Sequence, residues 1–67
     1  MTSFEATMIA EGAMEPPGDT SEERADSFIA AWQMLIDTGL AWKLQGWFGR
    51  RAAQMIEAGL CKSAPRT

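Results

Sequence analysis

The sequence predicts an all-α fold, a small bundle of three to four short helices with an antiparallel helical pair. Three observations lead to this prediction. Apolar residues recur at helical spacing through most of the chain. Two Thr-x-x-Glu capping boxes, at 2–5 and 20–23, mark helix starts. A pattern of aliphatic residue, acid, small residue, glycine and leucine occurs at 36–40 and again at 56–60, and each copy is typical of a helix end.

The repeated pattern predicts two helix ends because of its glycines. Gly39 and Gly59 stand where glycine takes a left-handed backbone conformation at little cost. The leucine after each glycine can fold back onto the preceding turn, so that Leu40 would contact Leu35 and Leu60 would contact Met55.

The first half of the chain predicts two helices and a linker. A first helix covers 3–11, with Phe4, Met8 and Ile9 on one apolar stripe. Pro16 and Pro17 then place a linker at 13–19, because neither proline fits inside a helix. A second helix, at 20–38, has the strongest periodicity, with its acids on the face opposite the apolar residues.

Glycines interrupt the helical spacing of the second half, residues 40–58. Gly46 and Gly49 would each cost about 0.5–1 kcal/mol in a helix interior. In one interpretation, a short helix 40–45 ends at Gly46 and a longer helix follows it and ends at Ala58. In the other, a single helix continues through both glycines, and their missing side chains let another helix pack against its backbone. We favour the break. The segment should pack antiparallel against helix 20–38, with helix 3–11 closing the apolar face and 61–67 forming a flexible tail.

The length and composition predict one small domain, 1–67, with few means of stabilising itself. The chain has one cysteine and no histidine, which excludes an intrachain disulfide and removes the usual ligands of zinc. Stability should therefore come from aromatic packing or from self-association as a homodimer. The large rings are Trp32, Trp42, Trp47, Phe4, Phe28 and Phe48.

The charge is −3 overall but unevenly distributed. Residues 1–37 hold eight acids and one arginine, whereas residues 38–67 hold five basic residues and one acid. If the helices fold antiparallel, much of this cancels through exposed ion pairs, each contributing at most about 1 kcal/mol. If they do not, an acidic face and a basic face remain available to partners. No apolar run approaches the ~20 residues of a membrane span, and the N-terminus lacks signal-peptide features, so we expect a cytoplasmic protein without membrane association.

The residue types argue against an enzyme. Without histidine there is no ordinary general base near neutral pH and no Ser/His/Asp or Cys/His arrangement. We interpret Cys61 as a spectator thiol, and we expect no catalytic residue, no metal and no cofactor.

A mixture of rings and cations in 42–51 predicts a binding surface. Trp and Arg dominate protein interface hot spots, which favours a protein partner. The same residue types stack bases and pair with phosphates, so a small nucleic-acid-binding regulator is the alternative, although the pI is 4.6. A fully internal aromatic core is the third interpretation, with Trp42 the best candidate for exposure and Trp32 for burial. The candidate partner-binding residues are Trp42, Lys43, Trp47, Arg50 and Arg51.

The stretch 31–50, AWQMLIDTGLAWKLQGWFGR, together with the ending IEAGL at 56–60 and the opening SFEA at 3–6, resembles a family of very short uncharacterised proteins of tailed bacteriophages. The resemblance implies an origin and no particular activity. Small phage proteins of this kind typically bind a host or phage protein stoichiometrically, sometimes to block a host defence. We therefore expect a non-enzymatic protein that binds a partner, host or phage, in the bacterial cytoplasm.

Overall fold

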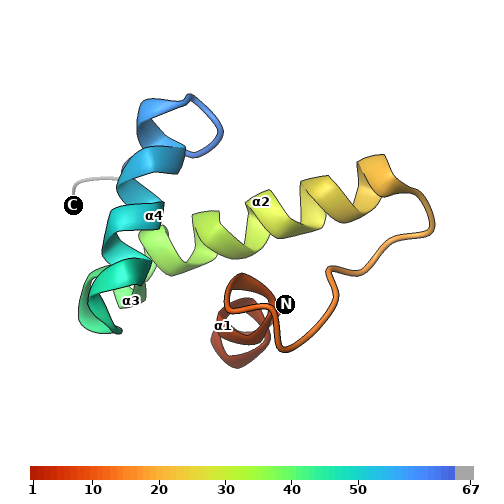
Figure 1. Cartoon of the computed structure of the whole chain (residues 1–67), viewed down its shortest axis with the longest axis horizontal. Coiled ribbons are helices and arrows are strands. Elements are labelled where there is room, and N and C mark those ends of the chain that lie inside the picture. Colours follow the sequence, from red (N-terminus) through yellow and green to blue (C-terminus); the bar gives the residue numbers. More distant parts are fainter. Residues whose placement is uncertain (65–67) are drawn as a thin grey trace.

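The computed structural model describes residues 1–64 and is all-helical, which confirms the predicted fold class (Figure 1). Residues 65–67 lie outside the described part, so the end of the predicted tail is not described. No strand occurs within residues 1–64. The helices are α1 (Ser3–Ala10), α2 (Ser21–Asp37), α3 (Leu40–Lys43) and α4 (Gly46–Glu57).

Both predicted capping boxes form, at the starts of α1 and α2. The Thr2 hydroxyl accepts a hydrogen bond from the Glu5 N–H at 3.1 Å, and the Glu5 carboxylate accepts one from the Thr2 N–H at 3.0 Å. Thr20 and Glu23 repeat the arrangement at 3.1 and 3.2 Å. The backbone bond from Thr2 and then its side-chain bond lower the pKa of Glu5. The ionised Glu5 carboxylate therefore stabilises the folded state. Its contribution is fully present above the ordinary pKa of a glutamate and is lost as the pH falls through the lowered pKa that Glu5 has in the folded state.

The predicted helix ends at Gly39 and Gly59 are confirmed. Both glycines are left-handed, with φ of +80° and +81°. After α4, Leu60 N–H donates to Met55 O at 2.9 Å and Gly59 N–H to Ile56 O at 3.0 Å, the two bonds of a Schellman motif. After α2, Gly39 N–H donates to Ile36 O at 3.1 Å, while its own carbonyl accepts from Trp42 N–H at 3.2 Å. Gly39 thus ends α2 and starts α3.

We expect Gly39→Ala to lower the free energy of unfolding by about 1–2 kcal/mol, the cost of a left-handed conformation for a residue with a Cβ. An added Cβ at Gly39 meets nothing within 4 Å, so the penalty is conformational and not steric. Gly49→Ala is the matched control, because Gly49 is helical and its added Cβ makes ordinary contact with the Trp42 ring at 3.4 Å. Urea denaturation followed by circular dichroism measures both. A Gly39 variant as stable as the wild type would contradict the left-handed assignment.

The predicted break between the two C-terminal helices is confirmed, and it lies just before Gly46. Leu44 and Gln45 have extended ψ values of −171° and 151°, and Gly46 is the first residue of α4. The continuous-helix alternative is therefore wrong. α3 does approach α4 at Gly49, but an added Cβ there would make only ordinary contacts, 3.4 Å from the Trp42 ring and 3.6 Å from the Ala41 carbonyl oxygen.

The core is apolar and collects side chains from all four helices. Trp32 is at its centre, fully buried, with ring centroids 5.8 Å from Phe48 and 6.3 Å from Trp47. Phe4, expected on the apolar stripe of α1, is instead 72% exposed. The buried residues are Ala6, Ile9, Ala31, Trp32, Leu35, Ile36, Ala41, Phe48, Ala52, Met55 and Cys61.

The two long helices cross steeply and do not lie alongside each other. Figure 1 shows α4 lying across the C-terminal part of α2, with α1 packed against α2 below it. The lengthwise antiparallel alignment expected for 20–38 and 40–58 is thus replaced by a crossing, because α3 and the extended residues at 44–45 reorient the chain before α4 begins. The crossing leaves an open angle between the N-terminal half of α2 and the end of α4 (Figure 1).

The segment after α4 is anchored at its start, in contrast to the flexible tail predicted for 61–67. The Gln33 side chain forms two hydrogen bonds with the Lys62 backbone, accepting from its N–H at 2.8 Å and donating to its carbonyl at 2.9 Å. The same amide donates to Asp37 at 2.9 Å. This clamp holds Cys61 buried against α2, with its sulfur 3.7 Å from the Ile29 carbonyl oxygen. Burial, with a smaller contribution from Asp37, raises the pKa of the Cys61 thiol, which disfavours the reactive thiolate.

We expect Gln33→Ala to destabilise the fold by about 1–2 kcal/mol, the net contribution of two hydrogen bonds. It should also increase the alkylation rate of Cys61 at neutral pH, because release of Lys62 exposes the thiol. Gln54→Ala is the control, since Gln54 is exposed on α4, away from the clamp. Alkylation by iodoacetamide under native conditions measures the effect. Equal rates in the wild type and the Gln33 variant would show that the clamp does not protect the thiol.

Candidate functional site

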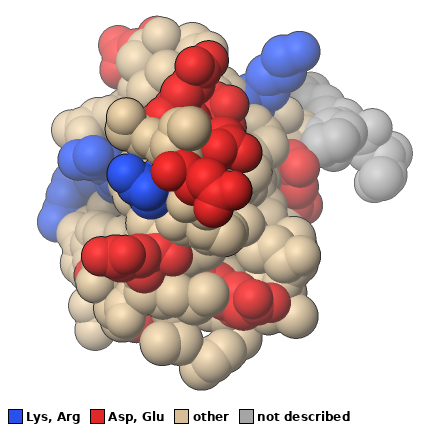
Figure 2. All heavy atoms as spheres, turned by 90° about the vertical axis from the view of Figure 1, so that its right-hand side faces the viewer, with Lys and Arg blue, Asp and Glu red and all other residues tan. Residues whose placement is uncertain are grey.

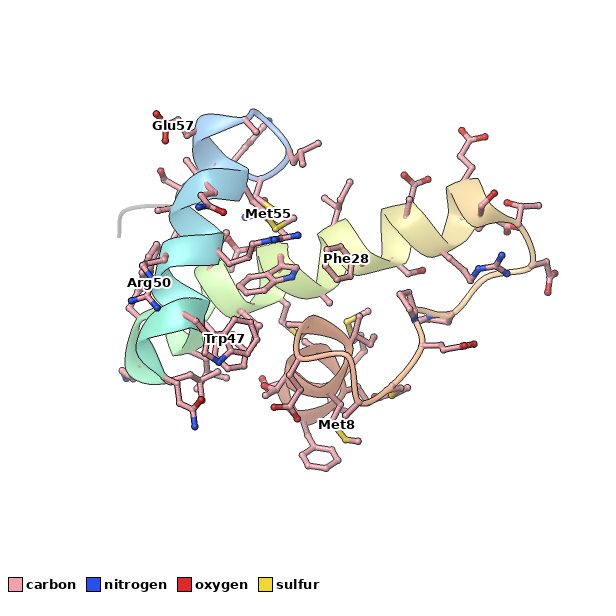
Figure 3. The ribbon with its side chains drawn as sticks, in the orientation of Figure 1. Met8, Phe28, Trp47, Arg50, Met55 and Glu57 are labelled. Atoms are coloured by element: carbon pink, nitrogen blue, oxygen red, sulfur yellow. The ribbon has the colours of Figure 1, made fainter. Side chains whose placement is uncertain are left out.

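The five residues predicted to bind a partner are all exposed, but they do not form one cluster. They divide between two sides of α4 because Arg50 and Arg51 are consecutive and therefore point about 100° apart around the helix. Figure 3 shows Arg50 on the side of α4 away from α2, and Trp47 on the side toward α1.

The first group, which we call the outer surface, consists of Trp42 and Arg50, together with Lys43, which is exposed and follows Trp42 on α3. The Trp42 ring lies over Gly49, 3.4 Å from the position of an added Cβ. A guanidinium nitrogen of Arg50 lies 3.3 Å from the corresponding position at Gly46. Because Gly46 and Gly49 are three residues apart on α4, they share one face of the helix, and this face brings the indole and the guanidinium to the same side. Trp42 remains 52% exposed, which agrees with the sequence prediction.

The second group, Trp47 and Arg51, lines a small recess of about 190 Å³ together with Ala10, Phe28 and Trp32. Trp47 stacks on Phe48 with ring centroids 3.9 Å apart and donates from its indole nitrogen to the Gln45 side chain at 3.2 Å. The Trp47 side chain is 38% exposed, so part of it packs in the core and part of it faces solvent.

Next to this recess is a larger groove, of about 950 Å³, that sequence reasoning did not find. Phe28 from α2 and Met55 from α4 both line it, and Figure 3 shows Met55 on the side of α4 toward α2. Arg24 and Arg51 contribute two guanidinium groups to its walls, and Glu15 from the linker contributes a carboxylate. The groove combines three segments that are far apart in the sequence, so no local pattern predicts it. Its apolar lining includes Ala25, Phe28, Ile29, Met55 and Leu60.

The charged side chains of residues 1–64 form no ion pairs with one another within 4.0 Å. The internal cancellation expected for antiparallel helices therefore does not take place among these residues. Figure 2 shows the acidic side chains gathered over the face that carries the N-terminal end of α2, with basic groups at its margin. On this face acidic side chains predominate, and basic groups lie directly beside them (Figure 2).

The described residues offer no evident metal chemistry. Within 1–64, no group of three or more His, Cys, Asp or Glu side chains could hold a metal ion. In the same part of the chain, every helix is too short or too polar to cross a lipid bilayer.

The sequence of α2 to α4 decides the family. A family described as a domain of unknown function, DUF7417, matches residues 21–66. This chain belongs to that family. The DUF7417 match begins with the first residue of α2 and includes the outer surface and both long walls of the groove, whereas α1 and the linker precede it. No curated protein and no solved structure matches the chain.

Proposed function

We propose that this chain is a non-enzymatic binding protein, encoded by a tailed bacteriophage, that binds a protein partner in the bacterial cytoplasm and inhibits a host process or defence there. The single observation that carries the proposal is Trp42, a large ring 52% exposed beside Lys43 and Arg50. The resemblance of 31–50 to small phage proteins supports the origin and the stoichiometric mode of action.

The packing of Trp42 supports its use in recognition. Its ring contacts the bare backbone face at Gly49 and is therefore partly ordered before any partner arrives. An ordered anchor loses less conformational entropy on binding than a freely rotating side chain. Lys43 and Arg50 add positive charge beside it without an ion pair to a carboxylate among residues 1–64, so they are available to an acidic partner surface.

Affinity capture from bacterial lysate tests this proposal, with the immobilised full chain, the Trp42→Ala variant and the Phe4→Ala variant side by side. Phe4 is the matched control because it is an exposed ring on α1, distant in sequence from the outer surface. We expect one protein to be retained in stoichiometric amount by the wild type and by Phe4→Ala, and lost with Trp42→Ala. Equal retention by all three would contradict a role for the outer surface.

Nucleic-acid binding is the second candidate, because Lys43, Arg50 and Arg51 are exposed next to two partly exposed tryptophans. Binding to random duplex and single-stranded DNA, measured from low to moderate salt, discriminates between the candidates. Phosphate contacts would make the affinity fall steeply with salt. We expect no binding even at low salt, and a steep salt dependence would favour the nucleic-acid regulator.

Self-association remains part of the proposal, since a chain of 67 residues without a disulfide has a small core. A two-fold dimer would make the melting temperature rise with protein concentration. Sedimentation analysis together with melting at several concentrations tests it, and a monomer with concentration-independent melting would contradict it.

A further inference from the structure

We propose that the groove between α2 and α4 is a second binding site, separate from the outer surface, and that its occupant is a short amphipathic helix of a partner protein that carries acidic residues beside an apolar face.

The apolar part of the groove suits one face of a helix. Its α2 wall runs from Ser21 to Ile29 and its α4 wall from Arg51 to Ala58. At 1.5 Å per residue, the α2 wall is about 12 Å long and the α4 wall about 10 Å. Because the two helices cross steeply (Figure 1), a bound helix would lie along one wall over about two turns, with one end against the other wall. Leu60 reaches over from the turn after α4 and is 53% exposed, a large apolar side chain without a covering partner within residues 1–64. Two turns supply apolar anchors at positions i, i+3 or i+4, and i+7 of the bound helix.

The charge of the groove selects an acidic occupant. The whole chain has a net charge of −3, yet the lining of the groove contains two guanidinium groups and a single carboxylate, from Glu15; the other acids at the N-terminal end of α2 lie outside the lining. Neither Arg24 nor Arg51 forms an ion pair among residues 1–64. Arg24 makes one long hydrogen bond, 3.4 Å, to the Gly18 carbonyl. Guanidinium groups recognise carboxylates through paired hydrogen bonds, so an acidic side chain at the edge of the apolar face would satisfy them.

The groove continues into the smaller recess through two shared residues. Phe28 and Arg51 line both the recess and the groove, so the two spaces adjoin. Trp32 also lines the recess, and its buried indole N–H has no hydrogen-bond acceptor within the described residues. Buried donors are rarely left unpaired. The Trp32 indole N–H is fully buried and out of reach of an occupant, so Arg51, which is exposed and lines both spaces, is the donor available to an acceptor there.

A helix fits this site better than an extended peptide. Extended segments bind mainly through backbone hydrogen bonds to a free sheet edge, and residues 1–64 contain no strand that could offer one. The walls here are helices whose backbone groups are used within the helices, so recognition depends on side chains. Side-chain recognition of an apolar row flanked by charge is the mode of a helix bound in a groove.

Two tryptophan-free peptides of about 18 residues test the proposal, because shorter isolated helices are marginal in water. Both carry leucine at the i, i+3, i+4 and i+7 positions of one face, and they differ only in having glutamate or lysine on the flanks. Backbone amide spectra of the full chain report where they bind, and fluorescence anisotropy reports the affinity. We expect the acidic peptide to bind with one-to-one stoichiometry and to shift the amides of Phe28, Ile29, Met55 and Leu60. The basic peptide should bind about tenfold more weakly or not at all.

Two neighbouring arginines provide the matched control. Arg51→Gln should weaken binding of the acidic peptide about tenfold, whereas Arg50→Gln, on the outer surface, should change it by less than about twofold. Trp42→Ala should leave peptide binding unchanged, which separates this site from the proposed function of the outer surface. Equal binding of both peptides, equal effects of the two arginine substitutions, or shifts centred on Trp42 would overturn the proposal. If the amide signals of the groove residues shift when the chain is diluted without peptide, a second copy of the chain covers the groove. That result would also overturn the proposal.

Discussion

Trp32→Ala is expected to lower the free energy of unfolding by about 3–5 kcal/mol, the usual cost of deleting a buried large aromatic side chain. Trp32 is fully buried and contacts both Trp47 and Phe48, so its removal leaves a cavity between α2 and α4. At roughly 0.05–0.15 kcal/mol per residue, a chain of this length has a total stability of about 3–10 kcal/mol. The variant should therefore lose at least about a third of the total stability, as measured by urea denaturation followed by circular dichroism and by loss of amide exchange protection.

Trp32→Phe separates packing from hydrogen bonding at the same position. Phenylalanine restores much of the lost volume and removes the indole N–H, which has no acceptor among the described residues. Because this donor makes no hydrogen bond, its deletion should not by itself lower the free energy of unfolding. The Trp32→Phe variant should therefore stay folded and lose less stability than Trp32→Ala. A Trp32→Phe variant as unstable as Trp32→Ala would show that the indole N–H has a partner, such as a buried water.

Local signals in the sequence predict most of the secondary structure. Thr20 and Glu23 stand three apart at the start of α2, and each of their side chains has a backbone N–H to accept from. Gly39 and Gly59 have no Cβ and take the left-handed conformation that ends a helix. These effects act within a few residues, so they depend little on the rest of the fold.

Contacts between distant segments are what the sequence does not predict. Gln33 is a polar residue on an exposed face of α2, and only the course of the chain after Gly59 brings Lys62 within hydrogen-bonding distance of it. The placement of Arg50 and Arg51 on different sides of α4 also depends on the course of the chain. The orientation of α4 follows from the extended conformation of Leu44 and Gln45, and this orientation places Arg51 in the groove and Arg50 outside it. No pattern in the sequence of 42–51 specifies that angle.

Trp42→Ala is expected to weaken binding of the protein partner by about 2 kcal/mol, roughly thirtyfold in the dissociation constant, which is the scale of an interface hot spot. The proposal identifies Trp42 as the central anchor because it is the largest exposed side chain of the outer surface and is held against Gly49. Lys43→Ala should weaken binding of the partner less than Trp42→Ala does, since an exposed charge at the rim of an interface contributes little affinity. Titration calorimetry with the captured partner measures both variants.

The same Trp42 substitution should leave the fold intact, and this makes its effect on binding interpretable. About half of the ring is already in water, so its removal should cost roughly 1 kcal/mol of stability, compared with 3–5 kcal/mol at Trp32. Urea denaturation of the two alanine variants under identical conditions provides the comparison. An unfolded Trp42 variant beside a stable Trp32 variant would reverse the assignment of surface and core. A folded Trp42 variant with unchanged affinity for the partner would agree with the assignment of Trp32 to the core. It would show that Trp42 does not contribute to the interface.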